Sequence, residues 1–419
     1  MNIGKLWLYI KNLIIKFFCR LIMNKRSTTR PHRKCVCGSG KKYRNCCGKK
    51  NTVNFNDLPR ETQQMVRELQ LKHKIATQYH HNNFGYTPEI MSSLFQGKRL
   101  VVLGGVLVQS DNPEKDWEEP ADFLTSHLRT TLGNEWFDKE LQSEEKERHI
   151  VVSWAIDGKF EVIDPNKPIE SRKLNGRALA YLHLAYDLYI LHNQGHITDK
   201  LISRLKSKQG FNGARYELFV LATMIRAGFK LEPFDETLGV GKVPECKAIH
   251  KETGITIQVE AKTRNVKYVL GSTEGKSKSI RLYDKLKDAI EKDVKEPYII
   301  FVDLNFPELN VYTDEEKMEK IRGEHYKLIE KHPSNLPNII VYTNIPFHYA
   351  RDFDVNISAF GLIKINHPKI TLEKEHIIFN AINLSLKQFE YLPKEFNESE
   401  KHADTVIDSM KNKGTNGPL

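Results

Sequence analysis

Four cysteines crowded into 13 residues constrain this chain more than any other feature of its sequence. Cys35 and Cys37 are followed by a Gly-Ser-Gly-Lys-Lys-Tyr-Arg-Asn insert and then by the adjacent pair Cys46 and Cys47. Disulfides of secreted proteins are spread along the chain to staple loops, which does not describe this cluster. A segment this short cannot bury a core, but four thiolates can surround one zinc ion and supply the folding energy. We therefore expect structural Zn²⁺ bound by reduced cysteines in a cytoplasmic protein.

This pattern resembles the SEC-C motif, which is found in the C-terminal tail of the translocase motor SecA and in many otherwise unrelated bacterial proteins. The resemblance covers only residues 35–47, and the last ligand, often His in that motif, is Cys47 here. It implies one structural zinc ion and a basic surface that docks on a partner such as the ribosome or a protein. It does not imply motor activity, because the chain contains no GxxxxGK[ST] phosphate-binding loop.

Positive charge is concentrated at the N-terminus. Residues 1–50 hold 14 Lys or Arg and no Asp or Glu, whereas the other 369 residues hold 50 basic and 53 acidic side chains. A basic arm on a nearly neutral globule favours an anionic partner, such as nucleic acid, the ribosome or a membrane surface. The alternative is a tail that only keeps the protein soluble.

The first 23 residues are apolar enough to raise the question of a membrane. Lysines and Arg20 interrupt residues 3–23, and most of the polar side chains fall in one sector of a helix. This pattern is typical of an amphipathic helix that lies on a membrane surface and not of a membrane span. Translation that begins at Met23 instead of Met1 stays an alternative.

The remainder of the chain alternates helical and strand signals. We therefore expect an α/β fold with a mixed central sheet flanked by helices, an α-rich middle region and a small N-terminal zinc knuckle. The expected division is a basic amphipathic arm at 1–30, the zinc knuckle at 31–50, an α+β region of unknown role at 51–175, an α/β domain at 176–390 and a polar tail at 391–419.

Apolar periodicity and turn residues place the individual elements. Helices are expected at 120–142, 144–150, 174–196, 213–228 and 279–293, and strands at 99–109, 150–156, 243–249, 254–263, 297–304, 338–343 and 359–366. Gly228 stands where a helix that ends near that residue would place its C-terminal glycine.

The strand expected at 254–263 carries the clearest chemical signal. Its apolar residues alternate onto one face, so Glu260 and Lys262 point together from the other face. If a hairpin turns near residue 252, Glu245 lies almost opposite Glu260, and the preceding helix offers Glu217 as a third carboxylate. Carboxylate oxygens are ligands that Mg²⁺ prefers, and a neighbouring lysine can position water or offset phosphate charge.

These residues resemble the PD-(D/E)xK nuclease superfamily, which has the restriction-endonuclease-like fold. Glu217 corresponds to the helix acid, Glu245 to the acid of the second strand, and Glu260-Ala-Lys262 to the E-x-K element, over about residues 200–345. The resemblance implies Mg²⁺ held by the three glutamates and a nucleic acid substrate. The sequence departs from the family at Glu245, where Asp is usual.

Simpler interpretations of the same residues stay open. Alternating charges on a strand are often only a solvated face. Arg264 could extend a basic, phosphate-facing edge, with Lys276, Lys278, Arg281 and Lys285 beyond it, or these cations could form an ordinary helix exterior. Asp303 and Asn305 could support the site, although a loop cap is the simpler role. The alternative function is a non-catalytic zinc-binding adaptor that binds ribosome, nucleic acid or protein through the basic N-terminus.

Overall fold

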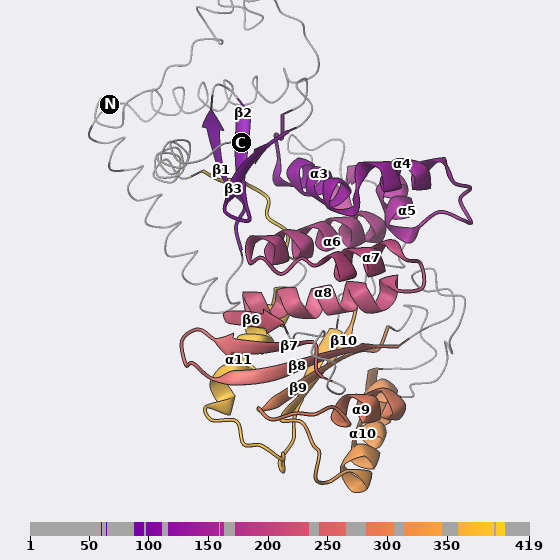
Figure 1. Cartoon of the computed structure of the whole chain (residues 1–419), viewed down its shortest axis with the longest axis vertical. Coiled ribbons are helices and arrows are strands. Elements are labelled where there is room, and N and C mark those ends of the chain that lie inside the picture. The colour runs from indigo at the N-terminus through magenta and orange to yellow at the C-terminus, as the bar shows by residue number, and fades with distance from the viewer. Residues whose placement is uncertain are drawn as a thin grey trace, which may run out of the picture. The chain divides into compact units, whose positions relative to one another are not determined.

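The computed structural model of the chain (Figure 1) describes part of its length. The described residues are 60, 64, 88–95, 98–110, 116–158, 160–162, 172–233, 243–264, 282–305, 314–345, 359–388 and 391–398. The chain divides into two compact units, Met1–Gln78 and Tyr79–Leu419, and every element below belongs to the second. The predicted zinc ligands Cys35, Cys37, Cys46 and Cys47, the arm and residues 399–419 of the predicted tail lie outside the described residues.

The elements are named as in Figure 1. The helices are α3 (Pro120–Leu132), α4 (Asn134–Gln142), α5 (Ile150–Asp157), α6 (Gly176–Asn193), α7 (Asp199–Lys206), α8 (Phe211–Arg226), α9 (Tyr283–Ile290), α10 (Asp314–Lys331) and α11 (Glu375–Lys387). The strands are β1 (Met91–Phe95), β2 (Lys98–Leu103), β3 (Val106–Gln109), β4 (Phe160–Val162), β5 (Arg172–Leu174), β6 (Phe229–Pro233), β7 (Cys246–His250), β8 (Thr256–Thr263), β9 (Tyr298–Asp303), β10 (Ile339–Asn344), β11 (Ala359–Lys364) and β12 (Asn397–Glu398).

A six-stranded mixed sheet organises the C-terminal part of this unit. Its strand order is β11-β10-β9-β8-β7-β6. The three central strands β8, β9 and β10 run parallel, and antiparallel strands flank them on both sides. Helices α8 and α11 share one hydrophobic core with one face of the sheet, and α9 and α10 share a second core with the other face (Figure 1). The prediction of a mixed α/β sheet flanked by helices is therefore confirmed.

Helix α6 joins the helical region to the sheet. It is buried on nearly every side, as expected for an internal helix that is apolar all round. Helices α3 and α5 pack against it on one side and α8 packs against it on the other (Figure 1). One continuous core therefore runs from α3 through α6 and α8 to the sheet, so the position of α8 depends on α6.

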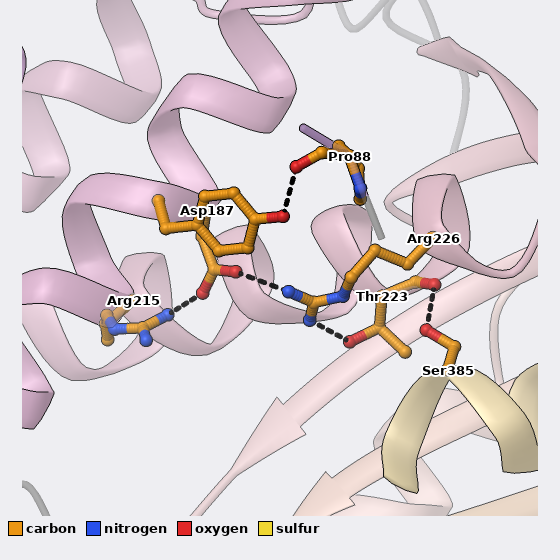
Figure 2. Close-up of polar contacts among 7 residues, drawn as sticks. Pro88, Asp187, Arg215, Thr223, Arg226 and Ser385 are labelled. Atoms are coloured by element: carbon orange, nitrogen blue, oxygen red, sulfur yellow. Dashed lines mark hydrogen bonds and ion pairs between the residues drawn. The ribbon is translucent and has the colours of Figure 1, made fainter. Parts of the chain in front are cut away.

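A buried ion network fastens α6 to α8 (Figure 2). The carboxylate of Asp187 accepts from Nη1 of Arg215 at 2.9 Å and from Nη1 of Arg226 at 3.2 Å, and Asp187 is 2% exposed. Nη2 of Arg226 donates to Oγ1 of Thr223 at 3.2 Å, and the carbonyl of Thr223 accepts from Oγ of Ser385 in α11 at 2.8 Å. Three helices are thus joined beneath the surface by hydrogen-bonded polar groups, as buried charges require.

Two expected elements differ from the structure because of glycine. The expected single strand at 99–109 is a hairpin, in which Gly104 and Gly105 have φ angles of 59° and 81° and form the turn between β2 and β3. The expected helix at 120–142 is divided into α3 and α4 at Gly133, which has a φ of 95°. Positive φ is readily available to glycine, so these breaks follow from the residues themselves.

The expected strand at 150–156 was wrong, because these residues form α5. A short run of apolar residues does not distinguish a buried strand from a buried helix. The helix is capped at its start by the ring of His149, which accepts from the backbone N–H of Val151. The expected helix at 144–150 is instead a series of turns that leads into α5.

Within the described part of the chain, none of the helices combines the length and apolar character needed to cross a membrane. Residues 3–23, for which a membrane-surface helix was predicted, lie outside that part.

Candidate active site on the β7–β8 hairpin

The hairpin of β7 and β8 has the register that the sequence predicted. Cys246 pairs with Val259, and the N–H of His250 donates to the carbonyl of Ile255 at 2.9 Å next to the turn. The next position along this register sets Glu245 beside Glu260. The N–H of Glu245 still donates to the carbonyl of Val259 at 3.0 Å, so the ladder continues to this residue.

The two faces of β8 have different surroundings. Ile257 and Val259 belong to the core that α8 covers, whereas the neighbours of Glu260 and Lys262 on β9, Ile300 and Val302, belong to the core that α9 covers. Glu260 is 0% exposed. The interpretation of this face as simply solvated is therefore wrong for Glu260.

Two lysines neutralise the buried carboxylate of Glu260. Oε1 lies 2.7 Å from Nζ of Lys262, and Oε2 lies 2.7 Å from Nζ of Lys292. The angles at these contacts are not those of hydrogen bonds, so the pairs are ionic contacts. The lysine side chains are 21% and 14% exposed, so each is partly open to solvent.

Lys292 is a member of the site that sequence reasoning missed. It follows the C-terminus of α9, and its Nζ also donates to the carbonyl of Val243 at 2.7 Å. One ammonium group thus joins the segment before Glu245 to the carboxylate of Glu260. Lysines and acids alternate irregularly between Glu291 and Glu296, so no periodic signal in the sequence marks this position.

Glu245 is the carboxylate whose ionisation is most altered. Burial raises its pKa to about 7, and repulsion from Glu217 and Glu260 adds to the rise, while Lys292 and Lys262 oppose it. A carboxyl group that titrates near neutral pH beside other acids is typical of functional sites. The three glutamates therefore lie near enough to one another to interact electrostatically.

Glu217 lies on α8 and already has a cationic partner. Its Oε2 forms an ion pair with Nη1 of Arg204 in α7. The side chain of Glu217 is 16% exposed, so this pair lies at the edge of the interior. Arg204 precedes the acid on a different helix, and only the packing of α7 on α8 shows that the two meet.

A magnesium ion would have to be bound by few protein ligands here. Among the residues that the structure describes, no three His, Cys, Asp or Glu side chains are arranged to hold a metal ion. Mg²⁺ is commonly held by only one or two carboxylates, with water and substrate phosphate as its other ligands. Glu245 and Glu260 are neighbours in the hairpin and offer two carboxylates for such an arrangement, although burial is the main cause of the raised pKa of Glu245. The larger set of Glu217, Glu245 and Glu260 stays a prediction.

Two polar residues near the site are engaged with the backbone. Oε1 of Gln258 accepts from the backbone N–H groups of Lys295 and Glu296 at 2.8 and 3.0 Å. Arg264 is not part of a basic edge, because it is 5% exposed and its Nη1 donates to the carbonyl of Leu304 at 2.7 Å. Of the predicted basic rim, Lys276, Lys278 and Arg281 lie outside the described residues, and Lys285 lies on α9.

A second polar cluster closes the carboxyl ends of the parallel strands. Oγ1 of Thr343 donates to Oδ1 of Asp303 at 3.1 Å and lies 2.8 Å from the hydroxyl of Tyr216. Asn305, with a φ of 45°, donates to the carbonyl of Arg264 at 3.1 Å. Burial raises the pKa of Asp303 to about 7. These groups satisfy one another, in keeping with a role in capping the loops.

Comparison of the chain with protein-family models, with curated proteins and with solved structures found no match.

Proposed function

We propose that this protein is a Mg²⁺-dependent nuclease whose C-terminal sheet is a restriction-endonuclease-like domain that hydrolyses phosphodiester bonds of nucleic acid. The proposal rests on one observation above all. A fully buried glutamate, Glu260, lies between Lys262 and Lys292 and beside Glu245 in the register of the hairpin. Burial of a carboxylate costs free energy, so an acid this deeply buried indicates either a function or a structural gain for the fold.

The residues have distinct roles in this proposal. Glu245 and Glu260 would hold Mg²⁺, which when bound lowers the pKa of water and stabilises charge on the phosphate. Mg²⁺ would have to replace the contacts of Glu260 with the lysines, because both of its carboxylate oxygens are buried and each lies 2.7 Å from an ammonium group. Lys262 would then face the phosphate and offset its negative charge, and Lys292 would keep the segment before Glu245 in place through the carbonyl of Val243.

The decisive experiment compares Glu260→Gln and Lys262→Met with Lys287→Met, using labelled DNA and RNA in the presence of MgCl₂. Lys287 is a partly exposed lysine of α9 whose Nζ lies 3.6 Å from Glu291, and it serves as the matched control. We expect cleavage by the wild-type and control proteins only, and inhibition by EDTA. Binding of nucleic acid without Mg²⁺-dependent cleavage by the wild type would contradict the proposal.

The second candidate function is a non-catalytic adaptor with a degenerate nuclease fold. The observation in its favour is that both oxygens of Glu260 already have cationic partners without any metal. In that case the wild-type protein and Glu260→Gln would bind ribosomes, nucleic acid or a protein partner equally well through the basic N-terminus, and neither would cleave.

We further propose that Cys35, Cys37, Cys46 and Cys47 bind one structural zinc ion in an N-terminal knuckle. The support is the spacing of the four thiols and the absence of acids from residues 1–50 of the sequence, which gives the knuckle a basic, anion-binding setting. Metal analysis of the full chain should find one zinc per chain, and Cys46→Ser with Cys47→Ser should remove it. Nucleic acid binding that is unchanged in that variant would argue against a role for the knuckle in docking.

A further inference from the structure

A cavity of about 430 Å³ lies between α10 and the edge strand β11, at the edge of the sheet away from the β7–β8 hairpin. Its floor is apolar and includes Ile329 of α10 and Ile363 of β11. Pockets that bind small molecules commonly measure about 300–1,000 Å³ and have mostly apolar walls. The cavity is therefore large enough for a ligand the size of a mononucleotide.

The charged side chains that line this cavity are basic. Arg322 and Lys364 line it together with His367, and no Asp or Glu is among the described residues that line it. Lys364 is partly engaged, because its Nζ lies 3.2 Å from Glu375, whereas Arg322 is exposed on the helix. A cavity lined by an arginine and a lysine, with no acid among its described lining residues, favours an anion, and a phosphate group in particular.

Two aromatic side chains of α10 also line the cavity and narrow the class of ligand. His325 is 7% exposed, lines the cavity, and its Nδ1 has no hydrogen-bond partner among the described residues. Burial lowers the pKa of His325, so at neutral pH its ring is an uncharged donor or acceptor. Tyr326 is 68% exposed at the same cavity, and an exposed ring of this kind offers a face on which a base can stack.

We propose that this cavity binds a nucleoside monophosphate, either free or as the 5′-terminal nucleotide of a strand. The base would contact the apolar floor and Tyr326, Nδ1 of His325 would hydrogen-bond to a polar edge of the base or sugar, and Arg322 would bind the phosphate. This assignment does not depend on the Glu260 site, because the residues come from α10 and β11 and none of them is needed for cleavage.

Isothermal titration of the full chain with adenosine 5′-monophosphate tests the proposal, with adenosine, ribose 5-phosphate and inorganic phosphate as partial ligands and a 5′-phosphorylated oligonucleotide as the second source. We expect the monophosphate to bind more tightly than any partial ligand. Arg322→Gln should weaken binding about tenfold or more, the loss expected for a charge-assisted hydrogen bond. Tyr326→Ala and His325→Phe should weaken it less, and a preference for the oligonucleotide would identify the strand end as the source.

Lys320→Gln is the matched control, because Lys320 is an exposed cation of the same helix that does not line the cavity. It should bind the monophosphate as the wild type does, and unfolding curves should show that each variant is folded. The proposal is overturned if the wild type does not bind the monophosphate at millimolar concentration. It is equally overturned if ribose 5-phosphate binds as tightly, or if Arg322→Gln binds no more weakly than Lys320→Gln.

Discussion

Two buried carboxylates in this molecule have the same number of cationic partners but different surroundings. Asp187, between α6 and α8, contacts two arginines that are 7% and 2% exposed and that donate well-formed hydrogen bonds (Figure 2). Glu260, on β8, contacts two lysines whose side chains are 21% and 14% exposed and whose contacts lack hydrogen-bond geometry.

Burial of an acid therefore does not by itself reveal its role. The arginines of Asp187 are buried with it and hydrogen-bonded to it, so that network is suited to fastening helices together. The lysines of Glu260 are flexible point charges that can move away, so this carboxylate can exchange partners. A second acid, Glu245, lies beside Glu260 with a pKa raised to about 7, whereas the charged groups among the described residues that act on the pKa of Asp187 are two arginines.

The largest expected effect is on stability, at the helix network. Asp187→Ala would leave two buried guanidinium groups without their carboxylate, which should lower the free energy of unfolding by about 3–5 kcal/mol. Asp138→Ala removes an exposed partner of Arg129 and should cost about 1 kcal/mol or less. Urea unfolding measures both. Equal losses in the two variants would mean that the Asp187 network does not fasten α6 to α8.

The next effect separates activity from stability at Glu260. Lys262→Met should lower the rate of Mg²⁺-dependent cleavage about 10²–10³-fold, the loss typical of removing one charge-stabilising group from an active site. It should lose less stability than Asp187→Ala, because Lys292 remains beside the carboxylate. Single-turnover cleavage and urea unfolding of the same preparation give the two numbers. A variant that loses stability but keeps its cleavage rate would make Glu260 a structural residue like Asp187.

The hairpin that carries these acids could be predicted because its information is local. Alternation along residues 254–263 fixes which side chains share a face, and a short polar turn ending in Gly254, which has a φ of 71°, fixes the register. The division of the strand expected at 99–109 was not predicted, although Gly104 and Gly105 between apolar runs are a hairpin signal.

The partners of the acids could not be predicted, because they come from other elements. Lys292 reaches Glu260 only through the packing of α9 on the sheet, and Arg204 reaches Glu217 only through the packing of α7 on α8. The spacing of lysines and arginines in a sequence does not show which acid each will contact in the fold. The same reason explains why the cavity between α10 and β11, which Arg322 and Ile363 both line, has no sequence signature.

The pH dependence of stability should also distinguish the two sites, because of Glu245. The folded carboxyl keeps its proton up to about pH 7, against 4.5 for the ordinary group, so between these values the folded state binds more protons. Stability should therefore fall as the pH rises through this window, by at most about 3.5 kcal/mol at roughly 1.4 kcal/mol per pKa unit. Glu245→Gln should flatten the dependence, as measured by urea unfolding at pH 5 and pH 8.

Magnesium should reverse this trend, because a metal ligand must be deprotonated. Adding MgCl₂ should stabilise the wild type more at pH 8 than at pH 5 and should leave Glu245→Gln unaffected. Stabilisation by MgCl₂ that is the same at both pH values, or that survives in the variant, would place the ion elsewhere.

Lys292 shares features with both sites, and its replacement should slow cleavage less than the replacement of Lys262. Like the arginines of Asp187 it links separate segments, through its contacts with Glu260 and the carbonyl of Val243, yet like Lys262 it can move into solvent. Lys292→Met should slow cleavage about tenfold by loosening the segment before Glu245, and Lys292→Arg should restore most of the rate because a guanidinium group can span both contacts. The MgCl₂ concentration for half-maximal cleavage should rise in the methionine variant and return in the arginine variant. A methionine variant with lower stability but an unchanged requirement for MgCl₂ would show that Lys292 acts only as a structural tether.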